Sequence, residues 1–279
     1  MEFYLFRLSL KAKEADFFVK RAPDGSPLTR QDWLRLFFSQ KHEFIHYRSK
    51  FVFKPETRIG SEDHPHLMFG WIAREMRQYE RTPPDEGLEP TEHMSWQAIF
   101  TIVDTQNDSQ LISMEYNADL GKPKALLESL VREMNHEEGA PFQTQAFPLV
   151  SAGSFWQFAE EHGNQIVWLS FDVAAPNMFD DVDDFQKELR ALRDKVNVAN
   201  VSAKLESDTT LKIEAERVGG IVDYVERGAG ELAAEAEDGS RYSSTSHEKK
   251  VNLDIDHHTK GERRFFREIM HAIGRLLPK

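Results

Sequence analysis

The feature that most constrains the fold is a strict two-residue alternation at the N-terminus, over residues 3–13. One set of alternate positions is large and apolar: Tyr4, Phe6, Leu8 and Leu10. The other set carries three basic residues, Arg7, Lys11 and Lys13, beside Phe3 and Leu5. Residues 44–54 repeat the alternation, with Ile45, Tyr47, Phe51 and Phe53 on one face, and basic or imidazole side chains on the other: His46, Arg48, Lys50 and Lys54. Such alternation predicts two half-buried strands, each with one basic face.

The order of the remaining patterns predicts an α+β protein of two packed lobes. Residues 165–279 are patterned as a strand, a helix, a hairpin of residues 196–205 and 211–218, a helix, a strand and a closing helix. This βαββαβ order is that of a ferredoxin-like lobe. The first half follows a related plan, a mixed sheet with helices. We therefore predict an N-terminal lobe over residues 1–150, a connecting segment over residues 151–164 and a ferredoxin-like lobe over residues 165–279.

Residues 76–95 interrupt the pattern of strands and helices. The segment is polar and acidic, and it contains Pro83, Pro84 and Pro90. Prolines of this density disfavour a regular ladder, so the sequence predicts a long exposed loop. A partner protein could dock on such a loop.

Composition excludes several classes of function. The chain of 279 residues contains no cysteine, which excludes disulfides, thiolate zinc sites, iron–sulfur clusters and a thiol nucleophile. No apolar run approaches the roughly 18 residues of a membrane span, and we expect a cytoplasmic protein. The net charge is −12, and such an acidic protein is not a general nucleic-acid binder. Residues 1–60 nevertheless carry an excess of five positive charges, so a local basic face is compatible with the sequence.

One short segment matches a metal-binding pattern. His42, Glu43 and His46 form an H-E-x-x-H sequence, in which a zinc peptidase holds the metal with both histidines and activates water with the glutamate. That chemistry requires a helix, whereas the segment runs into the strand alternation that begins at Phe44. We expect no metal and no other cofactor, and the segment stands as the basis of an alternative, a metal-dependent hydrolase.

A second short pattern lies near the C-terminus. Asp256, His257 and His258 resemble the triplet of the DHH phosphoesterases, but only 21 residues follow them. Asp254 and Asp256 share one strand face and could hold a divalent cation together with His258. A solvated sheet edge is the simpler interpretation.

The basic strand faces carry the leading functional hypothesis. If the two strands align in one sheet, seven residues form a positive platform for phosphates: Arg7, Lys11, Lys13, His46, Arg48, Lys50 and Lys54. Tandem ferredoxin-like lobes resemble the RNA-binding proteins of CRISPR systems, which implies RNA or DNA as the ligand. We therefore expect a non-enzymatic nucleic-acid-binding protein, within a bacterial defence or regulatory complex.

A different class of function is the main alternative. A protein-interaction subunit without nucleic-acid contact would bind other subunits through residues 76–95 and the C-terminal helix. That helix is amphipathic, and one of its faces is rich in arginine: Arg263, Arg264, Arg267 and Arg275.

Overall fold

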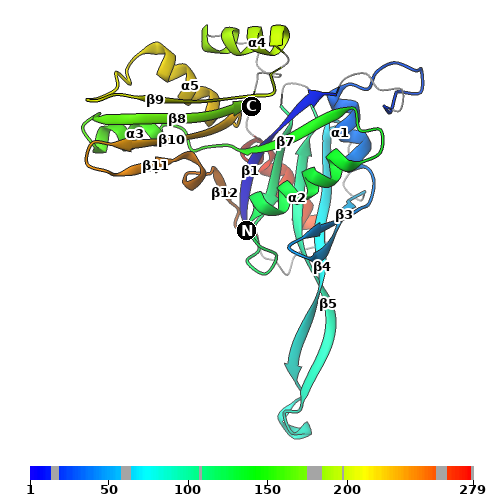
Figure 1. The fold of residues 1–279 in the computed structure, drawn as a ribbon. Helices are drawn as coiled ribbons and strands as arrows, with labels where there is room; N and C mark the ends of the chain where they lie inside the picture. Colours follow the sequence, from blue (N-terminus) through cyan, green and yellow to red (C-terminus); the bar gives the residue numbers. More distant parts are fainter. Residues whose placement is uncertain are drawn as a thin grey trace.

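The fold combines two antiparallel sheets with interspersed helices, as Figure 1 shows. The computed structural model describes residues 1–13, 19–57, 64–106, 109–174, 184–196, 198–255 and 263–277. Mixed α+β architecture is thus confirmed. Within these residues, no helix has the length and apolar character needed to span a bilayer.

The first sheet has eight strands and curves into a half-barrel. Its strands are β1 (Glu2–Ala12), β2 (His42–His46), β3 (Ser49–Pro55), β4 (Leu67–Arg81), β5 (Pro90–Asp104), β6 (Leu111–Glu115), β7 (Phe142–Pro148) and β12 (Lys250–Asn252). Their order across the sheet is β12-β1-β6-β5-β4-β3-β2, and β7 also pairs with β1, beyond β12 on the same edge. The N-terminal strand predicted from the alternation is therefore confirmed, and it lies inside the sheet.

Helices cover both faces of this sheet. The first face packs against α1 (Arg30–Phe38) and α2 (Pro123–His136), around buried Phe44, Phe53 and Ile72. The second face packs against α6 (Arg263–His271) and α7 (Ile273–Leu276), where Phe265 contacts the rings of Trp71 and Phe100. We call this second surface the α6 face. Because both faces are covered, the side chains on both sides of β1 are buried from Leu5 to Leu10.

Local sequence signals account for the starts of two helices. Thr29 caps α1 by accepting a hydrogen bond from the Asp32 N–H, and the Asp32 carboxylate accepts in return from the Thr29 N–H. Pro123 occupies the first turn of α2, where its missing N–H costs no hydrogen bond. Both signals, a capping threonine and a first-turn proline, can be read in the sequence.

The second sheet has four strands, β8 (Ile166–Ala174), β9 (Asn200–Glu206), β10 (Gly230–Ala236) and β11 (Arg241–Ser243), in the order β11-β10-β8-β9. The helices that accompany it are α3 (Ser154–Glu161), α4 (Asp184–Val196) and α5 (Glu216–Glu226). Their apolar residues form a separate core with the sheet, around Leu169, Val222 and Tyr224. Short 3-10 turns, η1 (Pro84–Glu86) and η2 (Ser244–Ser246), complete the described elements.

The predicted ferredoxin-like order differs from this second unit. Residues 211–218 were predicted as a strand, but they form a turn and the start of α5, and β9 has no hairpin partner after it. The observed order is βαβαββ, with β8 and β9 antiparallel across α4. The last strand predicted for this lobe, β12, pairs instead with β1 of the first sheet. The division at residues 151–164 remains a prediction.

The long loop predicted over residues 76–95 is also corrected. Most of this segment is regular strand, because β4 and β5 pair continuously from Leu67 with Asp104 to Arg81 with Pro90. The prolines fall at the tip, where Pro83 and Pro84 enter the turn and Pro90 begins β5. A proline at a strand end leaves the ladder intact. In Figure 1, the two strands extend far beyond the body as a single ribbon.

Candidate functional site

The predicted basic platform does not assemble. β1 and β3 are separated by β6, β5 and β4, which places them four inter-strand spacings of about 4.8 Å apart. Lys11 is half-buried, and Lys13 is exposed at the end of β1, where its Nζ donates to the Asn135 carbonyl at 3.2 Å. The seven residues therefore do not share one solvated surface.

Arg7 is a structural residue of the core. Its side chain is only 6% exposed, its Nε donates to the Arg227 carbonyl at 2.6 Å, and its Nη1 donates to the Ser109 carbonyl at 2.6 Å. Burial, with a smaller contribution from nearby Arg227, lowers its pKa to about 10. The guanidinium thus links β1 to the end of α5 and to the turn before β6, and Arg7 is not part of a solvated basic face. The alternation in the sequence could not reveal this, because it does not show that both faces of β1 are covered.

His46 is likewise removed from the basic face. Residues 44–54 are not one strand but a hairpin, since β2 ends at His46 and β3 begins at Ser49. The two turn residues, Tyr47 and Arg48, have positive φ angles of 43° and 67°. The turn reverses the chain, so His46 points inward and its Nδ1 lies 2.9 Å from the Ser129 hydroxyl. Burial and the nearby charge of Arg74 lower the pKa of His46.

The zinc-binding interpretation of His42, Glu43 and His46 conflicts with this strand. Four residues of β-strand span about 13 Å, so the two imidazoles cannot reach one metal ion. Each has another partner, since His42 Nε2 lies 2.8 Å from the Phe37 carbonyl and His46 bonds Ser129. Glu43 points to the opposite face, where it pairs with Lys41 and Lys50. In the described part of the chain, no three His, Asp or Glu side chains are grouped as a metal site. Residues 256–258 lie outside the described residues.

Three of the predicted basic residues remain exposed on the β2–β3 hairpin. Arg48 lies in the turn, and Lys50 and Lys54 project from β3 on the α6 face. Lys50 forms an ion pair with Glu43 at 2.5 Å. The exposed apolar side chains of Ile45 and Tyr47 lie on the same hairpin.

The β4–β5 ribbon is the most unusual surface of the protein. We call residues 75–96 the arm, because from Glu75 onward β4 pairs only with β5 among the described strands. Directly paired residues of antiparallel strands share a face. Three pairs therefore place Trp96, Met94 and Tyr79 on one face of the arm, each beside its cross-strand partner on that same face: Glu75, Arg77 and Glu92 respectively. Trp96 is 58% exposed, Met94 51% and Tyr79 70%. We call these three side chains the arm stripe.

The arm stripe continues the α6 face of the sheet. The same alternation runs from Trp71 and Phe100, which Phe265 covers, through Ala73 and Ala98 to Trp96. Ile45 and Lys50 belong to this face as well, through the register of β2 with β3 and of β3 with β4. Helix α6 covers only the body, so the apolar surface becomes exposed where the arm begins. Sequence analysis missed the arm stripe because the prolines of the tip suggested a loop.

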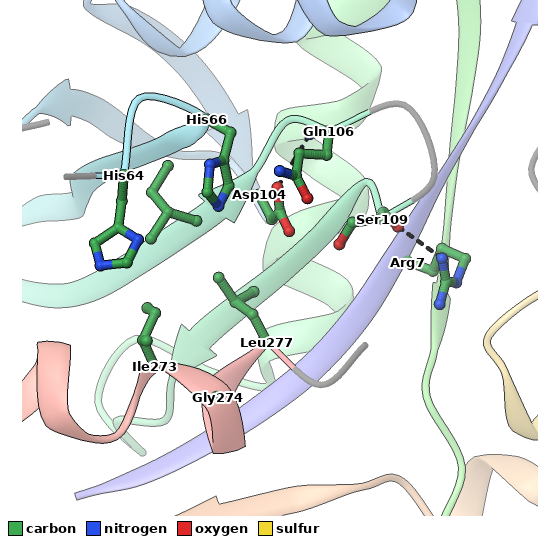
Figure 2. Close-up of a pocket in the computed structure, with 10 residues that line it drawn as sticks. Arg7, His64, His66, Asp104, Gln106, Ser109, Ile273, Gly274 and Leu277 are labelled. Carbon is green, nitrogen blue, oxygen red and sulfur yellow. Dashed lines mark hydrogen bonds between the residues drawn. The ribbon is translucent and has the colours of Figure 1, made fainter. Parts of the chain in front are cut away.

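A cavity of about 890 Å³ lies at the other end of β4 and β5 (Figure 2). His64, His66, Asp104 and Gln106 line one side of it, and Ile273 and Leu277 of the C-terminal helical segment line the other. The rings of His64 and His66 meet edge to face at 6.0 Å. The size and the mixed lining suit a small molecule with one polar and one apolar side.

Two of the polar side chains that line this cavity, Arg7 and Asp104, form hydrogen bonds within the protein. Arg7 Nε and Nη1 donate to backbone carbonyls, and Asp104 Oδ1 accepts from the Gln106 N–H at 3.0 Å. Among the lining residues that the structure describes, no hydroxyl or carboxylate is hydrogen-bonded to an imidazole.

Comparison of the chain with protein-family models, with curated proteins and with solved structures finds no significant match. The functional argument therefore rests on the geometry of these surfaces.

Proposed function

We propose that the protein is a non-enzymatic interaction subunit, whose arm binds a partner protein in an apolar groove with a basic rim. The observation that carries this proposal is the arm stripe, in which Tyr79, Met94 and Trp96 lie exposed on one face of a protruding two-stranded ribbon. Aromatic residues and methionine are enriched at the centres of protein interfaces.

The architecture of the arm supports binding rather than a structural role. A two-stranded ribbon without a packed face is at best marginally stable in water, because it buries little apolar surface. The arm stripe contributes nothing to the core of the body, and its exposure has a solvation cost. A partner that covers the stripe removes this cost and orders the ribbon.

The charge of the arm indicates the chemistry of the partner. Residues 75–96 contain six acidic and two basic side chains, a net charge of −4. One of the basic groups is neutralised locally, since Arg77 pairs with Glu92 at 3.3 Å. Three of the acidic residues, Asp85, Glu86 and Glu89, lie at the tip of the arm, so an apolar stripe that ends at an acidic tip is complementary to an apolar groove with lysine or arginine at its rim, which also accelerates encounter.

The tip of the β2–β3 hairpin extends the proposed interface. Tyr47 is 83% exposed, and Ile45 lies on the same face as the arm stripe. Non-glycine residues in the left-handed region store strain, which is frequent at functional sites. The strained turn at Tyr47 and Arg48 therefore supports a role for its side chains in contact.

The test is reconstitution with a partner isolated from the native host. A variant carrying Tyr79→Ser, Met94→Ser and Trp96→Ser removes the stripe without altering the core. Each hot-spot side chain contributes about 2 kcal/mol, so the triple variant should bind the purified partner more than a hundredfold more weakly. Leu205→Ser, which changes an exposed apolar residue on β9, is the matched control and should bind normally. Equal affinity of the triple variant would refute the proposal.

Nucleic-acid binding is the second candidate, and one observation favours it. Arg48 is next to exposed Tyr47 in the turn, and Lys50 and Lys54 follow on the same hairpin, a combination of cations and an aromatic ring that suits single strands. The acidic arm on the same face opposes phosphate approach, so we rank this function second. Fluorescence anisotropy with labelled RNA and DNA decides between the two: salt-sensitive binding lost in Arg48→Glu with Lys50→Glu would favour nucleic acid over a protein partner.

A further inference from the structure

The charges around the cavity of Figure 2 balance. Of the side chains that line it, Arg7 carries the positive charge and Asp104, the last residue of β5, the negative one. Burial lowers the pKa of Arg7, and the nearby charge of Asp104 opposes that shift. A charged ligand would therefore be left without a counter-charge, so the cavity favours a neutral ligand. It lies at the opposite end of β4 and β5 from the arm, and a ligand there and a partner on the arm would contact separate surfaces.

Asp104 offers a hydrogen-bond acceptor to such a ligand. Its side chain is 7% exposed, and Figure 2 shows its carboxylate directed into the cavity. Oδ1 accepts from the Gln106 N–H, whereas Oδ2 accepts no hydrogen bond from any residue that the structure describes. Buried polar groups are almost always hydrogen-bonded, so this oxygen calls for an N–H or O–H donor on the bound molecule.

The rest of the lining has one polar and one apolar side. His64 and His66 are half-buried beside Asp104, and neither imidazole is hydrogen-bonded to a described residue. A neutral imidazole has one donor and one acceptor nitrogen, so both rings are available to a ligand. Ile273 and Leu277 form the opposite, apolar side. The cavity thus suits a ligand with a polar edge and a flat apolar face.

We propose that this cavity binds guanosine, with two N–H groups of the base donating to the Asp104 carboxylate. Guanine is neutral, and its N1–H and 2-amino donors lie side by side, which matches the two oxygens of one carboxylate. Each carboxylate oxygen can accept two hydrogen bonds, so Oδ1 can also keep its bond from Gln106. The imidazoles can donate to O6 and N7 of the base, and Ile273 and Leu277 can cover its face. The volume of about 890 Å³ lies within the range of small-molecule sites.

The experiment titrates guanosine, inosine and adenosine separately into the full chain by isothermal calorimetry. Guanosine should bind most tightly, because it presents both donors to Asp104. Inosine lacks the 2-amino group and should bind about tenfold more weakly. Adenosine presents an acceptor nitrogen in place of N1–H, which the carboxylate repels, and it should not bind measurably. Absence of guanosine binding up to its solubility limit, or an equal affinity for adenosine, would overturn the proposal.

Asp104→Asn tests the carboxylate itself. The asparagine amide keeps an oxygen for the Gln106 N–H but replaces the second acceptor with a donor, which opposes the 2-amino group of guanosine. The variant should bind guanosine about thirtyfold more weakly and should no longer prefer it to inosine. Asp172→Asn makes the same change in an exposed side chain of β8, outside the cavity, and should have no effect. A wild-type preference for guanosine in Asp104→Asn would contradict the assignment of Asp104.

Gly274→Leu tests the location sterically. Gly274 lines the cavity, and no atom lies within 4 Å of a Cβ built at this position, so a leucine side chain has space to enter the cavity. The variant should keep the wild-type melting temperature and bind guanosine at least about tenfold more weakly. Gly219→Leu, at a helical glycine that also has open space but lies outside the cavity, is the matched control. Equal guanosine affinity in the two glycine variants would place the nucleoside elsewhere and overturn the proposal.

Discussion

The two-residue turn between β2 and β3 makes a sharp prediction about stability. Both Tyr47 and Arg48 occupy the left-handed region, with φ of 43° and 67°, although neither is glycine or asparagine. Two-residue hairpins with positive φ at both positions strongly prefer Asn-Gly. We predict that Tyr47→Asn with Arg48→Gly stabilises the protein.

The magnitude follows from the strain and from the contacts that are lost. Left-handed geometry costs a non-glycine residue roughly 1–2 kcal/mol, or about 2–4 kcal/mol for the pair. Glycine offsets about 0.5–1 kcal/mol of this gain, because it increases the conformational entropy of the unfolded chain. Tyr47 is 83% exposed, so removing its side chain costs little packing. The expected net gain in the free energy of unfolding is about 1–3 kcal/mol.

Urea unfolding followed by tryptophan fluorescence measures this gain in the free energy of unfolding. In a thermal scan, the melting temperature should rise by about 2–4 °C for each kcal/mol gained. Tyr79→Asn is the matched control, because it makes the same side-chain change within a regular strand, and it should not stabilise. A turn variant no more stable than the wild type would refute the strained-turn argument. If the turn of the β2–β3 hairpin also contacts the partner protein, the stabilised variant should bind that partner more weakly.

Three further predictions concern the core. Arg7→Met should destabilise by about 2–4 kcal/mol in chemical denaturation, because two buried carbonyls lose their donor, whereas Lys13→Met should be near neutral. The pKa of His46 is lower in the folded chain than in the unfolded chain, so below about pH 6.5 the unfolded chain binds a proton that the folded chain does not. The stability of the wild type therefore falls as the pH is lowered. His46→Gln should remove this contribution and flatten the acid side of the curve of stability against pH. Gly70→Ala should cost about 1–3 kcal/mol, because its Cβ would overlap the Phe53 ring, while Gly219→Ala has open space and should be neutral or stabilising.

Local patterns predicted the individual elements better than their arrangement. The alternation at residues 3–13, the cap at Thr29 and the start at Pro123 all identify elements that the structure contains. Strand order depends on contacts between distant residues, and local alternation contains no information about it. For that reason the separation of β1 from β3, which splits the predicted basic platform, could not be foreseen.

Two errors of the sequence prediction have specific physical causes. The β2–β3 turn contains none of the residues that normally mark a hairpin, although Tyr47 and Arg48 both have positive φ. The sequence therefore suggested one continuous strand, and His46 was placed on the wrong face. The arm was concealed by the prolines of its tip, although these fall outside the paired positions of the ladder or at its last pair. The resulting exposed stripe depends on the cross-strand pairing of Tyr79 with Glu92 and of Arg77 with Met94.

The most direct test of the proposed function is photo-cross-linking from the arm in the native host. A benzophenone amino acid replaces Trp96, which preserves an aromatic side chain, and the same probe at Lys212 serves as the control. We predict that the probe at residue 96 forms an adduct with one basic protein, and that the probe at residue 212 does not. The absence of a protein adduct, the same adducts from both positions, or an adduct removed by nuclease would contradict the assignment of the arm as a protein-binding surface.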